Sequence, residues 1–262
     1  MTWYTGDPVY DTVLTAGLIL AVLIAVAARY VDSPYGRFAS DAYGFNLGPR
    51  LGWFLMEVPA TLSFIFFFVM GADQGLVPLI FLVMWLIHYA NRGFIFPFLI
   101  RAPRGQKSSF SITVVLSGWL VTIMHGYLNA TWITDHGSYT SAWLTDPRFI
   151  IGFLVYYCGY FLNLHSDAII RNLRSRAEVE AGEKVYRIPR GGLFRWVSSP
   201  SYFSELLAWT GFAICTWSLG SVFILLVSMA NLVPRAFKTH AWYRQKFPDY
   251  PADRKVLIPF II

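Results

Sequence analysis

Four polar side chains follow one another at helical spacing near the end of an apolar stretch. The separations are four, four and three residues for Asn163, Asp167, Arg171 and Arg174, so on a helix they share one stripe. The stripe begins with an amide and a carboxylate and ends with two guanidinium groups, which match phosphate oxygens. It would suit an extended ligand that carries polar groups at one end and phosphates at the other. A salt-bridged helix end that emerges into water would produce the same spacing.

Other ionisable side chains lie inside apolar stretches, where charge is expensive. They are Glu57, His88, Arg92, His165, Asp167, Glu205 and Arg235. A lone carboxylate such as Glu57 costs several kcal/mol in an apolar helix unless it is paired or protonated, which favours a functional role. His88 and Arg92 are also consistent with a packed polar pair. We expect no chemical role for His125 and His136.

The composition indicates which elements must position these residues. Hydrophobic residues make up 56% of the 262 residues and charged residues only 14%, whereas a soluble domain averages about 25% charged residues. Cys158 and Cys215 lie far apart in apolar runs, which excludes a disulfide scaffold and a cysteine zinc site. The sequence lacks the Rossmann, P-loop, H-E-x-x-H and G-x-S-x-G motifs. We therefore predict an all-α, multi-pass membrane protein with one domain over residues 1–262.

Seven apolar stretches are long enough, or nearly so, to cross a hydrocarbon core. They cover about residues 13–28, 51–70, 77–100, 110–131, 149–170, 202–217 and 221–237. Runs such as LILAVLIAVAA do not alternate as the strands of a membrane β-barrel do. The first stretch is not expected to be a cleavable signal peptide, because no Lys or Arg precedes it.

The basic residues support seven transmembrane helices. Of the 21 Lys and Arg residues, 19 lie in the loops after the first, third and fifth stretches, or in the C-terminal segment counted from Arg235 at the inner end of the last stretch. The opposite side has only Arg148, and Arg92 lies within a stretch. The rule that cytoplasmic loops are basic places the N-terminus outside and the C-terminus in the cytoplasm. The net charge of +6 is thus a topology signal, and we expect no nucleic-acid partner.

The depth of the polar groups favours a pocket over a conduction path. Glu57 would lie roughly 9 Å and Tyr89 roughly 15 Å from the cytoplasmic ends of their helices. All seven buried ionisable groups occupy the cytoplasmic half, whereas a channel or transporter tends to carry polar groups through both halves. The long inner segments at about 170–201 and 237–262 would cap this cytosol-facing pocket.

Several segments together resemble the steroid 5α-reductase family. They are WFLMEVPA around Glu57, IHYANR around Tyr89, NLHSDAIIRNLR from Asn163, YRIPRGGLFRWVSSPSYFSELLAWTGFAICTWS from Tyr186, and RAFKTHAWYRQKFPDYPADRKVLIPFII from Arg235. They occur in family order and cover most of the chain beyond the first stretch. The C-terminal half alone is less specific, because related membrane reductases and isoprenylcysteine methyltransferases have a similar shape there.

The resemblance implies a seven-helix enzyme that uses NADPH to reduce the 4,5 double bond of 3-oxo-Δ4-steroids. It assigns the substrate's 3-carbonyl oxygen to Glu57 and Tyr89. It assigns NADPH to the 163–174 stripe, with Arg171 and Arg174 towards the phosphates. Further cofactor-side matches are Tyr35, Tyr186, Ser201, Glu205, Arg235 and Tyr243, and Arg101 and Arg104 in IRAPRGQK match more loosely as phosphate ligands.

The residue types suit this chemistry. Hydride addition to the β carbon of an enone leaves negative charge on the carbonyl oxygen, which two preorganised donors would stabilise. Tyr89 can donate at neutral pH. Glu57 donates if it is protonated, as the acid of ketosteroid isomerase does in a similar pairing with tyrosine. If it is ionised, it can orient Tyr89, and the sequence is consistent with both.

Departures from the family pattern leave alternatives open. The family often has Asn at Ser201 and Glu at Ala208, and it is usually richer in histidine around His240. The substrate could instead be another lipid enone, an enoyl thioester or a polyprenal. Two further alternatives to a reductase are a methyltransferase that uses S-adenosylmethionine and a transporter or channel. The expected partners are a lipid-like substrate and membrane lipids, without an obligate protein partner. A bacterial inner membrane and the endoplasmic reticulum are both consistent with the sequence.

Overall fold

The computed structural model describes residues 3–31, 44–101, 110–182 and 185–262. Its long helices are α1 (Pro8–Ala27), α2 (Pro49–Met70), α3 (Leu76–Tyr89), α5 (Ile112–Thr131), α6 (Pro147–Asn172), α8 (Pro200–Thr216) and α9 (Leu219–Lys246). Shorter helical pieces are α4 (Phe96–Leu99), α7 (Arg176–Glu180), π-helical turns at Ala90–Ile95 and Trp132–His136, and 3₁₀ turns at Ser141–Thr145 and Gly192–Arg195. Two strands, β1 (Asn46–Leu47) and β2 (Phe110–Ser111), pair antiparallel.

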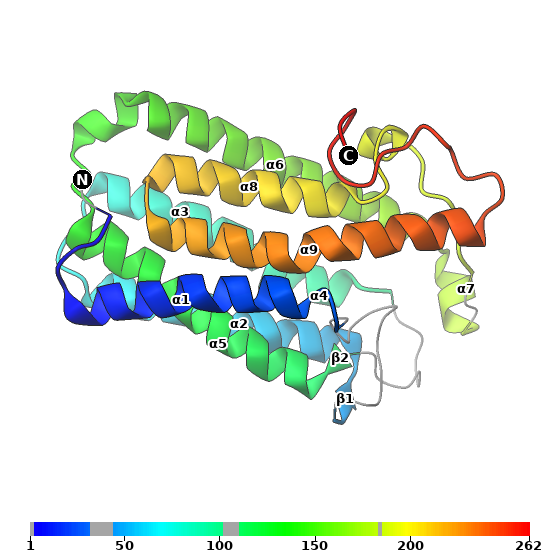
Figure 1. Cartoon of the computed structure of the whole chain (residues 1–262), viewed down its shortest axis with the longest axis horizontal. Helices are drawn as coiled ribbons and strands as arrows, with labels where there is room; N and C mark the ends of the chain where they lie inside the picture. The colour runs from blue at the N-terminus through cyan, green and yellow to red at the C-terminus, as the bar shows by residue number, and fades with distance from the viewer. Residues whose placement is uncertain (1–2, 32–43, 102–109, 183–184) are drawn as a thin grey trace.

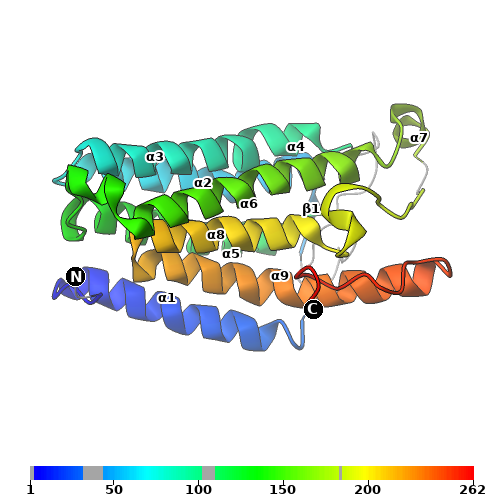
Figure 2. The same cartoon turned by 90° about the horizontal axis from the view of Figure 1, so that it is seen from above.

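The long helices lie side by side in one bundle (Figures 1 and 2). α8 packs between α6 and α9, α2 packs along α5, and α1 lies at the edge against α9. We call the end that holds β1, β2, α7 and the C-terminal segment the capped end (right in Figure 1). The N-terminal tail lies at the opposite end.

The predicted helical class agrees with this architecture. Within the described residues, six helical segments are long and apolar enough to cross a membrane: Pro8–Ala27, Pro49–Met70, Leu76–Leu99, Ile112–His136, Pro147–Asn172 and Leu219–Lys246. The stretch predicted at 202–217 is helix α8, but its 17 residues are about 25 Å long and fall short of a typical span. Seven spans, and the orientation of the two termini, therefore remain predictions.

One boundary differs clearly from the sequence expectation. We placed the end of the last apolar stretch at Phe237, yet α9 continues to Lys246 through Pro234. The C-terminal segment that was expected to cap the pocket therefore begins as helix. Beyond it, Lys255 pairs with Val197, and Arg254 donates to the carbonyl of Pro189 over 2.9 Å. The two long inner segments thus contact each other at the capped end.

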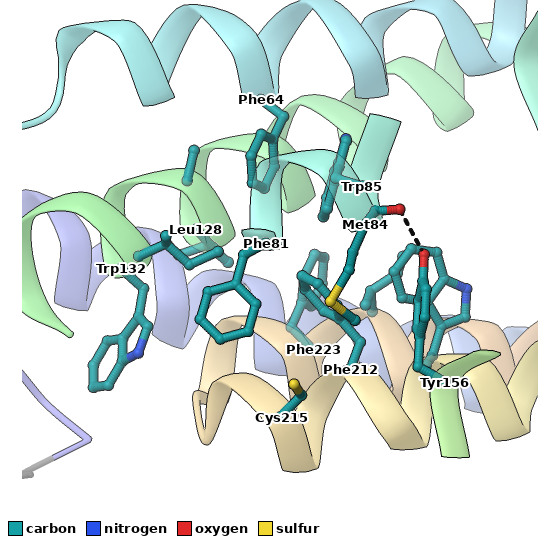
Figure 3. Packing of buried hydrophobic residues seen from close by; sticks show 14 of the residues in the cluster. Phe64, Phe81, Met84, Trp85, Leu128, Trp132, Tyr156, Phe212, Cys215 and Phe223 are labelled. Atoms are coloured by element: carbon teal, nitrogen blue, oxygen red, sulfur yellow. Dashed lines mark hydrogen bonds between the residues drawn. The ribbon is translucent and has the colours of Figure 1, made fainter. Parts of the chain in front are cut away.

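Aromatic side chains fill the bundle core. Phe64, Phe81, Trp85, Phe212 and Phe223 are fully or almost fully buried (Figure 3). The hydroxyl of Tyr156 on α6 donates to the carbonyl of Met84 on α3 over 2.8 Å, the bond drawn in Figure 3. This core fixes α3 against α6 and α8.

Glycines bring α6 and α8 into backbone contact. A Cβ on Gly159 would lie 2.4 Å from the backbone nitrogen of Ala208, and one on Gly211 would lie 2.2 Å from that of Tyr156. Only a residue without a side chain fits at such distances, as in the small-residue interfaces of membrane helices. The close approach lets short polar side chains on α6 reach those on α8.

Candidate active site

A cavity of about 510 Å³ lies within the bundle, towards the capped end. Residues of α1, α2, α3 and its π-helical turn, α5, α8 and α9 line it. The lining is mostly apolar, and its ionisable members among the described residues are Glu57, His88, Tyr89, Arg92 and Glu205. The volume is in the range of small-molecule pockets, and the few polar groups would orient a largely apolar ligand.

Glu57 and Tyr89 enter the cavity from neighbouring helices. Glu57 lies on α2 and is 8% exposed. Gly93 packs closely against it, since a Cβ added at Gly93 would lie 3.3 Å from the Cβ of Glu57. Tyr89 is 3% exposed and is the last residue of α3 before the π-helical turn, a feature frequent at functional sites. Neither the carboxyl of Glu57 nor the hydroxyl of Tyr89 makes a hydrogen bond in the described part of the chain. Both groups are therefore available to a ligand.

Glu205, in contrast, is committed to protein partners. Its Oε2 accepts a hydrogen bond from Nδ2 of Asn163 over 3.1 Å, and its Oε1 accepts one from Nε1 of Trp209 over 2.9 Å. Nε2 of His88 lies 3.3 Å from Oε1. Three donors around one buried carboxyl favour the ionised form. Glu205 was expected on the cofactor side, and the structure places it in the cavity lining.

Arg92 forms an ion pair with Asp167. Its Nη1 lies 3.6 Å from Oδ2 of Asp167, and its guanidinium lies 4.7 Å from the centre of the Trp53 ring. His88 and Arg92 each face a different acid, Glu205 and Asp167 respectively. Among the ion pairs of the described residues, none joins Asp167 to Arg171. The stripe on α6 is thus not a helix end closed by its own salt bridges.

Arg101 contacts the end of the stripe at the capped end. Arg101 donates to Oδ1 of Asn172 over 2.9 Å and to the carbonyl of Arg174 over 2.6 Å. Arg174 lies beyond the end of α6, because Ser175 begins α7 with a capping box that includes Glu178. The helical stripe therefore ends at Arg171. Tyr35 and Arg104 fall outside the described residues.

The remaining predicted residues lie outside the cavity, on the side of α8 and α9. The backbone carbonyl of Ser201 accepts a hydrogen bond from Nδ2 of Asn163 over 2.9 Å. Arg235 is buried, and its Nε lies 3.5 Å from the hydroxyl of Tyr202. Tyr243 stacks on Tyr250, and Tyr186, 45% exposed, meets Trp242 edge to face.

Two cavity-lining aromatics escaped the sequence analysis. Trp53 and Trp209 each lie four residues from a buried carboxylate, Glu57 and Glu205 respectively. That spacing places each indole on the same helix face as the acid. Helical spacing from the two acids would have identified both residues.

Comparisons with known proteins agree on one family. A family model described as 3-oxo-5-alpha-steroid 4-dehydrogenase matches residues 108–262. The 3-oxo-5-alpha-steroid 4-dehydrogenase 1 of Rattus norvegicus is 39% identical over 246 residues, which cover 93% of this chain and 92% of that protein. The protein of the same name from Mus musculus is 41% identical over 246 residues, which cover 93% of each chain. Steroid 5-alpha-reductase DET2 of Solanum lycopersicum is 34% identical over 248 residues, 93% of each chain.

Proposed function

Because this chain belongs to the steroid 5α-reductase family and is an oxidoreductase that acts on CH–CH groups, we propose that it reduces the 4,5 double bond of 3-oxo-Δ4-steroids with NADPH. The observation that carries the proposal is the pairing of two unengaged polar groups, Glu57 and Tyr89, at the wall of a mostly apolar cavity. Such a cavity suits a rigid lipid with a single carbonyl to be recognised.

Glu57 and Tyr89 hold the 3-carbonyl oxygen of the substrate in this proposal. Hydride addition at C5 leaves negative charge on that oxygen, and a donor aimed at such charge typically contributes about 10²–10³ in rate. Tyr89 donates its hydroxyl proton. Glu57 has no hydrogen-bond donor in the described part of the chain, so its buried carboxyl is better accommodated as the neutral acid, which also donates.

Glu205 has the opposite environment and a different task. Its three donors favour a carboxylate that holds His88, Trp209 and Asn163 in place. Two buried acids with contrasting surroundings are a common way for one site to keep one carboxyl neutral and another ionised. Glu205 then links the cavity to α6, which carries the proposed cofactor residues.

The donor set at the capped end fits a dinucleotide with phosphates. Arg101, Arg171 and Arg174 have no carboxylate within ion-pair distance in the described part of the chain, and guanidinium groups bind phosphate oxygens well. NADPH supplies the hydride when bound. We place Asn163, Asp167 and Ser201 along the cofactor nearer the cavity. Its phosphates would be held by Arg101, Arg171 and Arg174. The proposed set is completed by Tyr186, Arg235 and Tyr243, with Tyr35 and Arg104, while Glu205 acts on the cofactor side through its bond to Asn163.

The membrane setting suits both reactants. A steroid partitions into lipid and reaches the cavity from the bilayer, whereas NADPH approaches from the basic cytoplasmic side. The concentration of 19 basic residues on one side favours an anionic cofactor there.

The direct test uses detergent-purified protein. NADPH oxidation is followed with and without testosterone or progesterone, and the mass and C5 configuration of the product are determined. We expect steroid-dependent oxidation and a 5α-dihydro product. NADPH binding without steroid turnover would refute the substrate class, and a folded protein that binds no NADPH would refute the cofactor assignment.

A further inference from the structure

Beside Glu57, the wall of the cavity includes two residues that meet where α2 packs on α5. Met56 precedes Glu57 on α2, and Gly118 lies on α5, and both line the cavity. A Cβ on Gly118 would lie 2.5 Å from Cγ and 3.3 Å from Sδ of Met56. The methionine side chain therefore occupies the space that the glycine leaves open.

The backbones on either side are held close together. Nε1 of Trp119 donates to the carbonyl of Leu55 over 2.7 Å, so the residues adjacent to Gly118 and Met56 are hydrogen-bonded to each other. Further along the same interface, a Cβ on Gly126 would lie 2.8 Å from the backbone nitrogen of Phe64. An added methyl group at residue 118 must be absorbed by rotation of Met56, which is unbranched and adaptable.

We propose that Gly118 and Met56 together determine which substituents the enzyme accepts beside the reacting enone. This inference rests on the proposed function, because Glu57 must hold the 3-carbonyl for Met56 to lie near the first ring. With glycine at 118, Met56 lies against α5 and leaves room next to the carbonyl. With a larger residue at 118, the methionine side chain turns into the cavity and fills that room.

The test compares two substrates that differ by one methyl group beside the carbonyl, testosterone and 2α-methyltestosterone. The readout is the ratio of their kcat/KM values, methylated over parent, for each variant. A ratio is unaffected by the fraction of protein that folds, since both substrates meet the same preparation. One methyl group in a close-fitting pocket changes such a ratio roughly tenfold or more.

We expect Gly118→Ala to lower the ratio roughly tenfold or more and Met56→Ala to raise it. The double variant Gly118→Ala/Met56→Ala should restore the ratio at least to the wild-type value, because the effect of residue 118 acts through Met56. Gly48→Ala is the matched control, since a Cβ there meets nothing within 4 Å.

The inference would be overturned if Gly118→Ala leaves the ratio unchanged, or if it lowers the ratio and Met56→Ala does not restore it. In either case, turnover of testosterone by the wild type would still uphold the proposed function. If the wild-type protein does not reduce testosterone, the proposed function fails and this inference fails with it.

Discussion

Asn163 on α6 donates a hydrogen bond to Glu205 on α8, with 3.1 Å between Nδ2 and Oε2. The same amide nitrogen donates to the carbonyl of Ser201 over 2.9 Å. Both amide hydrogens are therefore used. One side chain thus joins α6, which carries the proposed phosphate ligand Arg171, to the lining of the cavity. Close glycine packing between the two helices makes this short connection feasible.

Replacement of Asn163 by leucine should destabilise the protein. Glu205 would lose one of its donors inside the bundle, and an unsatisfied buried group costs about 1–3 kcal/mol. Thermal unfolding in detergent should show a lower midpoint for Asn163→Leu than for the wild type. Asn172→Leu serves as the control, because Asn172 is exposed at the end of α6 and its loss should cost less than about 1 kcal/mol. Equal midpoints for the two variants would contradict a structural role for the Asn163 bond.

Glu57→Ala and Tyr89→Phe should each lower kcat by about 10²–10³, the usual effect of removing one donor from a developing oxyanion. NADPH affinity should change little, because both side chains face the substrate in our account. Steady-state kinetics with testosterone, together with NADPH binding by fluorescence, separates the two effects. Near-wild-type turnover in both variants would refute the assignment of the 3-carbonyl oxygen to Glu57 and Tyr89.

Glu57→Gln distinguishes the two states of the acid. An amide can donate a hydrogen bond as a neutral carboxylic acid does, whereas it cannot replace an ionised base. We expect this variant to keep much more activity than Glu57→Ala. Equal losses in the two variants would instead favour an ionised Glu57 that orients Tyr89.

Arg171→Ala and Arg174→Ala should weaken NADPH binding. A hydrogen bond to a charged group contributes about 1.5–3 kcal/mol, so each Kd should rise roughly 10- to 150-fold. The kcat at saturating NADPH should remain close to the wild-type value. Arg148→Ala is the control, since Arg148 lies in the first turn of α6, at the other end of that helix from Arg171, and pairs with Asp146. A Kd that rises equally in all three variants would argue against phosphate recognition by the stripe.

Gly211→Ala should disrupt the packing of α6 on α8. The added Cβ would lie 2.2 Å from the backbone nitrogen of Tyr156, and neither backbone can yield as a flexible side chain does. Overpacking costs typically about 1–3 kcal/mol. We expect a lower unfolding midpoint and reduced activity for Gly211→Ala. Gly48→Ala, where a Cβ meets nothing within 4 Å and φ is −58°, should behave like the wild type.

The helices and the anchor residues of the cavity could be predicted because their signals are local. Apolar runs located the long helices to within five residues at each end, with two exceptions. They missed the end of α9, and they did not show that the 77–100 stretch divides into α3, a π-helical turn and α4. The cost of burying Glu57 made it a candidate site residue without any partner in view, and it lines the cavity. The end of the stripe before Arg174 was missed, although Ser175 and Glu178 have the spacing of a capping box.

Contacts between helices could not be predicted in the same way. The pairing of His88 with Glu205, and of Arg92 with Asp167, depends on how α3 is rotated against α6 and α8. A single sequence gives the apolar face of each helix but not which neighbour that face meets. For the same reason the sequence did not show that Glu205 lines the cavity.

The central claim is hydride transfer from NADPH to C5 of a steroid held at Glu57 and Tyr89. The most direct measurement uses NADPH with deuterium at both C4 positions, and testosterone as substrate. Mass spectrometry and deuterium NMR then locate the label in the product. We predict one deuterium per product molecule, at C5 in the α configuration. Deuterium at C3 would identify carbonyl reduction instead, and a dihydro product without deuterium would show that NADPH is not the hydride source.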